Sequence, residues 1–261
     1  MGLIKWGKEA YKDFTEDRNE AKKEYEARLK KKKAIAEKNK EILVTVSDEK
    51  RMISALAAPF RSSMFWDWFS IFKYSEEENE EDYHYPIHLH TFGPEVVLTD
   101  EEVETLKKVI ERDFLVFDRQ TALSAIQKII EDGWEKPFNH IENKEDLRLV
   151  FLLNQEACEH YALFLTMLTS LLISSVDLGY INEKEVLMTM EELTCYTSYA
   201  FKDWQDYSEK LLAGERKSKL NRFLGRKFIE KFIGYLLVKA GSPWQWISLR
   251  ESNNLSSNFQ K

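Results

Sequence analysis

The stretch YALFLTMLTSLLISSV occupies residues 161–176 and contains no charged side chain. It is shorter than the roughly 20 apolar residues that a membrane-spanning helix needs, and serine and threonine side chains dilute it. A helix that is apolar around most of its circumference is expected to be surrounded by other elements. The sequence therefore predicts that this stretch forms the central helix of a buried core.

The composition of the whole chain agrees with a helical fold. Of its 261 residues, 43% are apolar, and only 9 are glycine and 5 proline. All-β sandwiches and barrels need frequent Gly and Pro turns, so this shortage favours long helices. We predict an all-α protein: a multi-helix orthogonal bundle around the central apolar helix, with a long charged N-terminal helical arm.

Capping signals predict the helices around the centre. Thr99 with Glu102 opens a helix to about Arg112, and Asn182 with Glu185 opens another. Proline and glycine predict the ends. We expect a helix from about Asp48 that stops before Pro59, and one from Asp118 that ends at Gly133 with positive φ. A third helix is expected to run unbroken from Asn143 through Val176 to Gly179. The last two are expected from Phe201 to Gly214 and from about Ser218 to Ala240.

The charge is distributed unevenly along the chain. Residues 1–45 hold 13 basic and 9 acidic side chains, a net of +4, which leaves −11 for residues 46–261 of the total of −7. Binding of nucleic acid needs clustered positive charge, so the acidic body argues against a nucleic-acid partner. Membrane contact through residues 1–40, which include Lys30 to Lys33, is the alternative to a solvated arm.

Charge and composition also predict the domain organisation. We expect a charged helical arm over 1–45, an aromatic-rich helical segment with an acidic loop over 46–98, a main helical domain over 99–250 and a disordered tail over 251–261. The first residues lack the apolar core of a secretion signal. We therefore predict a cytoplasmic protein in which Cys158 and Cys195 are reduced, buried thiols.

The most aromatic segment is MFWDWFSIFKY, residues 64–74. Aromatic stripes at helical spacing usually belong to a core, but an exposed stripe of this kind can bind a partner. In the second case the candidate partner-binding residues are Phe65, Trp66, Trp68, Phe69 and Phe72.

Three of the five histidines lie within YHYPIHLH, residues 83–90. In an extended segment His84, His88 and His90 would project to one side, where they could hold Zn²⁺ with a fourth ligand such as His140. Pro86 interrupts such a strand, and the spacing matches no well-defined zinc motif. A polar, aromatic connection that binds no metal is the alternative, and the sequence predicts no cofactor.

Motifs of common enzymes are missing from the sequence. It contains no G-x-S-x-G, H-E-x-x-H, P-loop or G-x-G-x-x-G pattern. Glu156 and His160 have the spacing of half a metal site in a helical bundle, without a second half. A pair of this kind is more often hydrogen-bonded than catalytic.

Several short motifs of the second half resemble a known family. They are DR at 118–119 before EDGW at 131–134, DLGYINEKE at 177–185, FKDWQDY at 201–207 before AGER at 213–216, and SPW at 242–244. Over about residues 99–247 the chain resembles the bacterial domain of unknown function 1266 (YbeU/YbeR-like proteins). The central helix departs from that family, because ACEH at 157–160 stands where members carry an Arg or a Trp-Asp pair. The resemblance implies a helical fold and bacterial origin. It does not imply any particular activity.

The function predicted from these observations is a non-catalytic helical protein-interaction protein of the bacterial cytoplasm. One version is an immunity or antitoxin-like protein, whose acidic surface would attract a basic toxin. Two alternatives remain open: a metal-dependent enzyme that uses the histidines or the Glu156/His160 pair, and a membrane-peripheral factor that binds through the N-terminal segment.

Overall fold

The computed structural model describes residues 23, 38–39, 41–64, 87–141, 143–218, 223–238 and 242–249. The chain divides into two units, residues 1–44 and residues 45–261. Within these described ranges every regular element is a helix and none is a strand, so the predicted all-α class is confirmed. Most of the predicted arm 1–45 and the whole tail 251–261 lie outside the described residues.

The second unit is built around α8 (Gln155–Asp177), which contains the predicted central stretch. Sixteen of its 23 residues are buried. Of the described helices it is the one long and apolar enough to cross a membrane, yet 83% of its apolar window is buried inside the protein. Among the helices that contact it are α2 (Asp48–Met64), α4 (Asp100–Phe114), α5 (Arg119–Ile130), α7 (Lys144–Leu153), α9 (Glu183–Thr194) and α11 (Trp204–Ser218).

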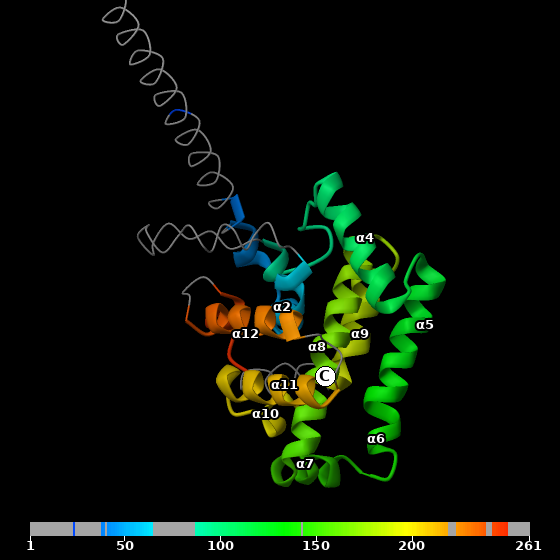
Figure 1. The fold of residues 1–261 in the computed structure, drawn as a ribbon, viewed down its shortest axis with the longest axis vertical. Coiled ribbons are helices and arrows are strands. Elements are labelled where there is room, and N and C mark those ends of the chain that lie inside the picture. Colours follow the sequence, from blue (N-terminus) through cyan, green and yellow to red (C-terminus); the bar gives the residue numbers. More distant parts are fainter. Residues whose placement is uncertain are drawn as a thin grey trace, which may run out of the picture. The chain divides into compact units, whose positions relative to one another are not determined.

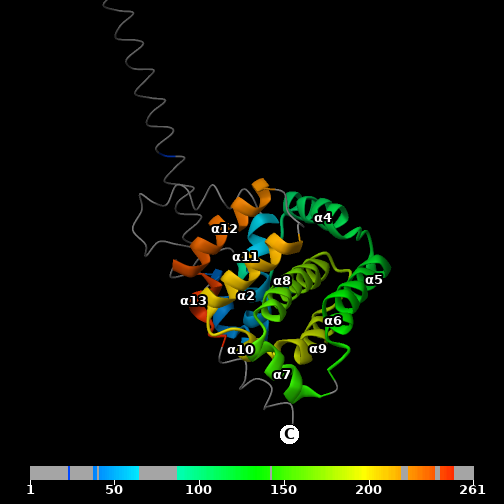
Figure 2. The same ribbon diagram turned by 60° about the horizontal axis from the view of Figure 1, so that its bottom comes forward.

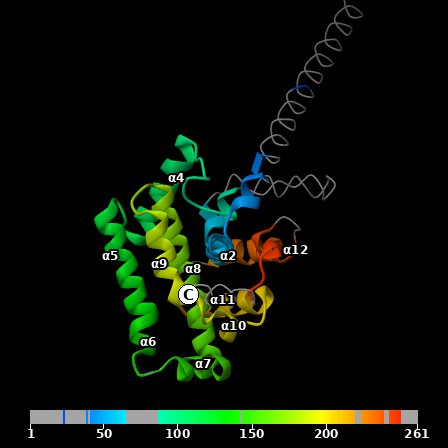
Figure 3. The ribbon, with the colours of Figure 1, turned by 180° about the vertical axis from the view of Figure 1, so that it is seen from behind.

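These helices lie on two sides of α8. Figure 1 shows α2, α11 and α12 (Phe223–Val238) on one side and α5 and α9 on the other, with α7 at one end. Figure 2 adds α13 (Pro243–Trp246) to the first group, and Figure 3 shows the division from behind. The short elements are η3 (Ile87–Leu89), η4 (Glu131–Glu135), α6 (Lys136–Phe138) and α10 (Thr197–Ala200).

The capping signals in the sequence act as predicted. Thr99, Asp118 and Asn182 each form a capping box, and Asn143 accepts a hydrogen bond from the backbone N–H of Asp146. Each cap satisfies backbone N–H groups that have no partner inside the helix.

Pro59 does not end the second helix, contrary to the prediction. It lies inside α2, which continues to Met64. Proline cannot donate the hydrogen bond that the carbonyl of Ala55, four residues earlier, would receive in a regular helix. That carbonyl accepts one from Trp244 Nε1 at 2.8 Å instead, so a tryptophan from α13 satisfies the group that proline leaves without its helical partner.

The predicted helix from Asn143 to Val176 is two helices, α7 and α8. They meet at Asn154, whose backbone is extended (φ −117°, ψ 103°) and whose Oδ1 accepts hydrogen bonds from the N–H groups of Glu156 and Ala157. Hydropathy does not reveal this break, because apolar residues occur on both sides of it. The break is instead indicated by Asn154, because asparagine favours the N-cap position of a helix.

Gly133 and Gly214 lie inside helical segments, so the prediction that they end helices was wrong. Among the described glycines, Gly93 and Gly179 have positive φ. A Cβ on Gly133 would come within 2.3 Å of the Phe164 ring, and a Cβ on Gly214 within 2.4 Å of the Glu159 carbonyl oxygen. These two glycines are required by close packing against α8.

Residues 45–261 form one compact unit, so the domain boundary predicted at residue 98/99 does not separate two bodies. The reason is α2, whose buried residues Met52, Ile53 and Leu56 belong to the same core as α8. Both cysteines are free: Cys158 is buried and Cys195 is partly buried. Burial raises the pKa of Cys158 to about 11, so its thiol is protonated at neutral pH.

Candidate functional site

Long-range polar contacts join the α8–α9 turn, residues 177–185, to α2 and to α5. Gly179 has φ +72°, a conformation that side chains with a Cβ rarely adopt, and this lets the chain reverse after α8. Asn182 then starts α9 and is bonded to Glu185 in both directions. The turn thereby presents three carboxylates, from Asp177, Glu183 and Glu185.

Asp177 is paired with Arg61 of α2, and both side chains are fully buried. One Arg61 Nη donates to Asp177 Oδ2 at 2.6 Å, and Arg61 Nε donates to the His88 carbonyl at 3.0 Å. The N–H of Gly93 lies 3.3 Å from Asp177 Oδ1. A buried charge is stable only when it is paired and hydrogen-bonded, and Asp177 meets both conditions.

Lys50 of α2 reaches the same turn. Its Nζ lies 2.7 Å from Glu95 Oε2 and 2.9 Å from Glu183 Oε2, and 5.1 Å from the centre of the Phe92 ring. Lys50 and Arg61 are eleven residues apart, about three helical turns, so they lie on one face of α2. That face therefore holds the segment 88–95 and the α8–α9 turn together.

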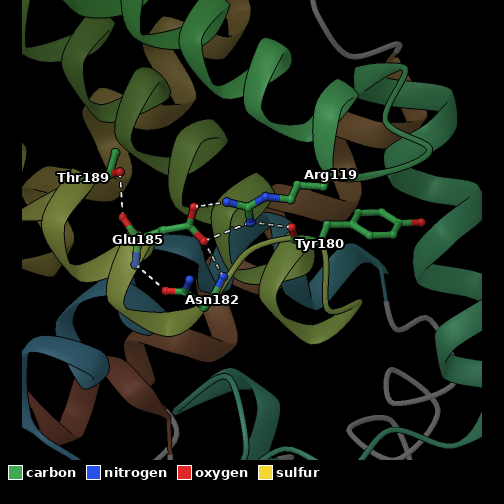
Figure 4. A network of polar contacts seen from close by, with 5 residues as sticks. All are labelled: Arg119, Tyr180, Asn182, Glu185 and Thr189. Carbon is green, nitrogen blue, oxygen red and sulfur yellow. Dashed lines mark hydrogen bonds and ion pairs between the residues drawn. The ribbon is translucent and has the colours of Figure 1, made fainter.

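Arg119 of α5 approaches the turn from the other side (Figure 4). Its guanidinium donates to both carboxylate oxygens of Glu185, at 2.6 and 3.1 Å, and to the Tyr180 carbonyl at 3.0 Å. Thr189 Oγ1 donates to the Glu185 carbonyl at 2.8 Å. The hydrogen bonds from Arg119 are the main reason that the pKa of Glu185 is lowered.

What these carboxylates can do chemically depends on the cations with which they are paired. Each of the three carboxylates accepts hydrogen bonds from a different cation: Arg61, Lys50 or Arg119. The lowered pKa of Glu185 makes its carboxylate a weak base, which is poorly suited to general acid–base catalysis. The geometry fits a joint that fixes α2 and α5 to the junction of α8 and α9.

Two of the three predicted metal-binding histidines lie next to this joint. His88 and His90 are both buried, and the ring of His90 lies 5.1 Å from that of Trp246. Burial lowers the pKa of His88 well below its usual range, and Arg61 and His90 act in the same direction.

Two features of this region bear on the predicted zinc site. Residues 87–89 form a 3₁₀ turn, so the extended geometry assumed for His88 and His90 was wrong. In the described ranges no three His, Cys, Asp or Glu side chains are grouped as metal ligands. His84 lies outside those ranges, and the zinc site with His84, His88 and His90 stays a prediction.

The Glu156/His160 pair is not formed. The carboxylate of Glu156 is exposed and lies 2.9 Å from Lys217 Nζ, whereas His160 Nε2 lies 2.9 Å from the Gly133 carbonyl oxygen. The two side chains therefore contact different elements, Lys217 in α11 and Gly133 in η4. The structure therefore does not supply this half of a metal site.

The candidate partner-binding residues Phe65, Trp66, Trp68, Phe69 and Phe72 lie outside the described residues. The sequence reasoning also overlooked Lys50, Arg61 and Arg119. A usable signal was present in α2: in the apolar run MISALAAPF, residues 52–60, the flanking cations Lys50 and Arg61 are three turns apart on one face. A cation on the apolar face of a helix implies an acidic partner in the core.

A second surface feature lies on α7. Leu149, Leu152 and Leu153 are 52%, 59% and 83% exposed. Their spacing of three and four residues places them side by side on one face of the helix. We call these three residues the α7 leucine face.

Comparisons of the chain with protein-family models, with curated proteins and with solved structures find no match.

Proposed function

We propose that this chain is a non-catalytic helical protein-interaction protein of the bacterial cytoplasm. The observation that carries the proposal is the pairing at the α8–α9 turn. The fold brings the carboxylates of Asp177, Glu183 and Glu185 together there. Each of them forms an ion pair with a cation of another helix. In the part of the chain that the structure describes, this polar cluster joins helices, and we therefore expect the function to reside at the surface.

The surface has properties of a protein-binding surface. Residues 46–261 carry a net charge of −11, and a strong single-sign charge speeds association with an oppositely charged partner. The α7 leucine face exposes contiguous apolar area, which is typical of interaction sites. An immunity or antitoxin-like protein that binds a basic toxin is the specific version that these properties favour.

The bacterial assignment is based on the motifs that resemble the domain of unknown function 1266, and the cytoplasmic assignment on the features of the sequence. Within the motif DLGYINEKE, the resembling residues Asp177, Gly179, Asn182 and Glu185 each have a structural role in the turn. A family that shares this motif is expected to share the turn between α8 and α9.

The test is to isolate and reconstitute a complex. Tagged protein is crosslinked in a bacterial host, the bound protein is identified by mass spectrometry, and its affinity for the purified chain is measured. We expect a basic partner whose affinity falls with salt. The double variant Trp66→Ala/Trp68→Ala tests the candidate residues of the 65–72 segment, with circular dichroism as the control for folding.

Two results would contradict the proposal. The first is stoichiometric zinc in chelator-free protein that is lost in His88→Ala/His90→Ala, which would favour the metal-dependent enzyme. The second is flotation of the full chain with anionic liposomes that is lost without residues 1–45, which would favour the membrane-peripheral factor.

A further inference from the structure

We draw no further inference here: the strongest candidate, the α7 leucine face of Leu149, Leu152 and Leu153, is an exposed apolar face of a helix, and nothing in the structure shows what covers it.

Discussion

Helices α7 and α8 follow one another with a single residue, Asn154, between them, and both are rich in leucine. In α8 the leucines are buried, whereas in α7 three of them are exposed. The local sequences do not explain the difference, since both helices would be counted as apolar. It arises because α2, α5, α9 and α11 surround α8, whereas α7 packs at one end of the bundle against α8 and α10. A leucine in a helix therefore belongs to the core only where other helices cover it.

The ion pairs of the two helices should differ most. Asp177→Ala at the end of α8 leaves Arg61 buried without its carboxylate and should lower the free energy of unfolding by about 3–5 kcal/mol. Glu145→Ala breaks the exposed pair with Arg148 on α7 and should cost at most about 1 kcal/mol. Urea unfolding of the two variants measures both values. Equal losses would show that the joint at the α8–α9 turn does not stabilise the fold.

The same substitution in each helix sharpens the comparison. Leu168→Ala in α8 removes a side chain with no exposed area and should cost about 2–5 kcal/mol. Leu153→Ala in α7, where the leucine is 83% exposed, should change the stability by less than about 0.5 kcal/mol. Thermal and urea unfolding are the measurements. A large loss in Leu153→Ala would mean that the α7 leucine face is covered by this chain itself.

The closeness of the packing around α8 can be tested with glycines. Gly214→Ala places a methyl group against the Glu159 carbonyl and should destabilise the protein by about 1–3 kcal/mol. Gly234→Ala in α12 has open space around the new Cβ and should stabilise the helix by up to about 1 kcal/mol. Opposite signs in the two variants, measured by urea unfolding, are the expected result. A neutral Gly214→Ala would show that α11 can move away from α8.

The smallest effect is a pH dependence of stability from His88, whose carbonyl accepts a hydrogen bond from Arg61. The pKa of His88 is well below its usual range in the folded protein, so the unfolded chain takes up a proton that the folded chain refuses. The stability of the wild-type protein should therefore fall as the pH drops below about 6.5, by at most about 1.4 kcal/mol per pH unit from this group. In His88→Asn this decrease should be smaller. Urea unfolding between about pH 5 and pH 7 gives the two slopes, and identical slopes would refute the assignment.

The positions where prediction failed share a physical cause. Pro59, Gly133 and Gly214 have a strong local tendency to end helices, and in each case a contact from another helix overrides it: Trp244 bonds the Ala55 carbonyl, Phe164 covers Gly133, and the α8 backbone touches Gly214. Local propensities are worth about 1 kcal/mol for glycine, which close packing easily outweighs. The capping boxes at Thr99, Asp118 and Asn182 were predictable because their bonds are within four residues.

The candidate site shows the same limit. Each carboxylate of the α8–α9 turn was visible in the sequence, and Glu185 was predicted to take part in the cap at Asn182. Their partners Arg119, Arg61 and Lys50 are 66, 116 and 133 residues away along the chain. No periodicity links such distant positions.

By itself the sequence determined that the chain is helical, that residues 161–176 form its centre, and where most helices begin, because these properties depend on composition, hydropathy and neighbours within one turn. Only the tertiary structure decided which cation pairs with which acid, which glycines lie inside helices, and which leucines face outward. These contacts depend on the surfaces of other helices. A residue meets neighbours that are distant in the sequence only when the chain has packed, so its local sequence does not specify them.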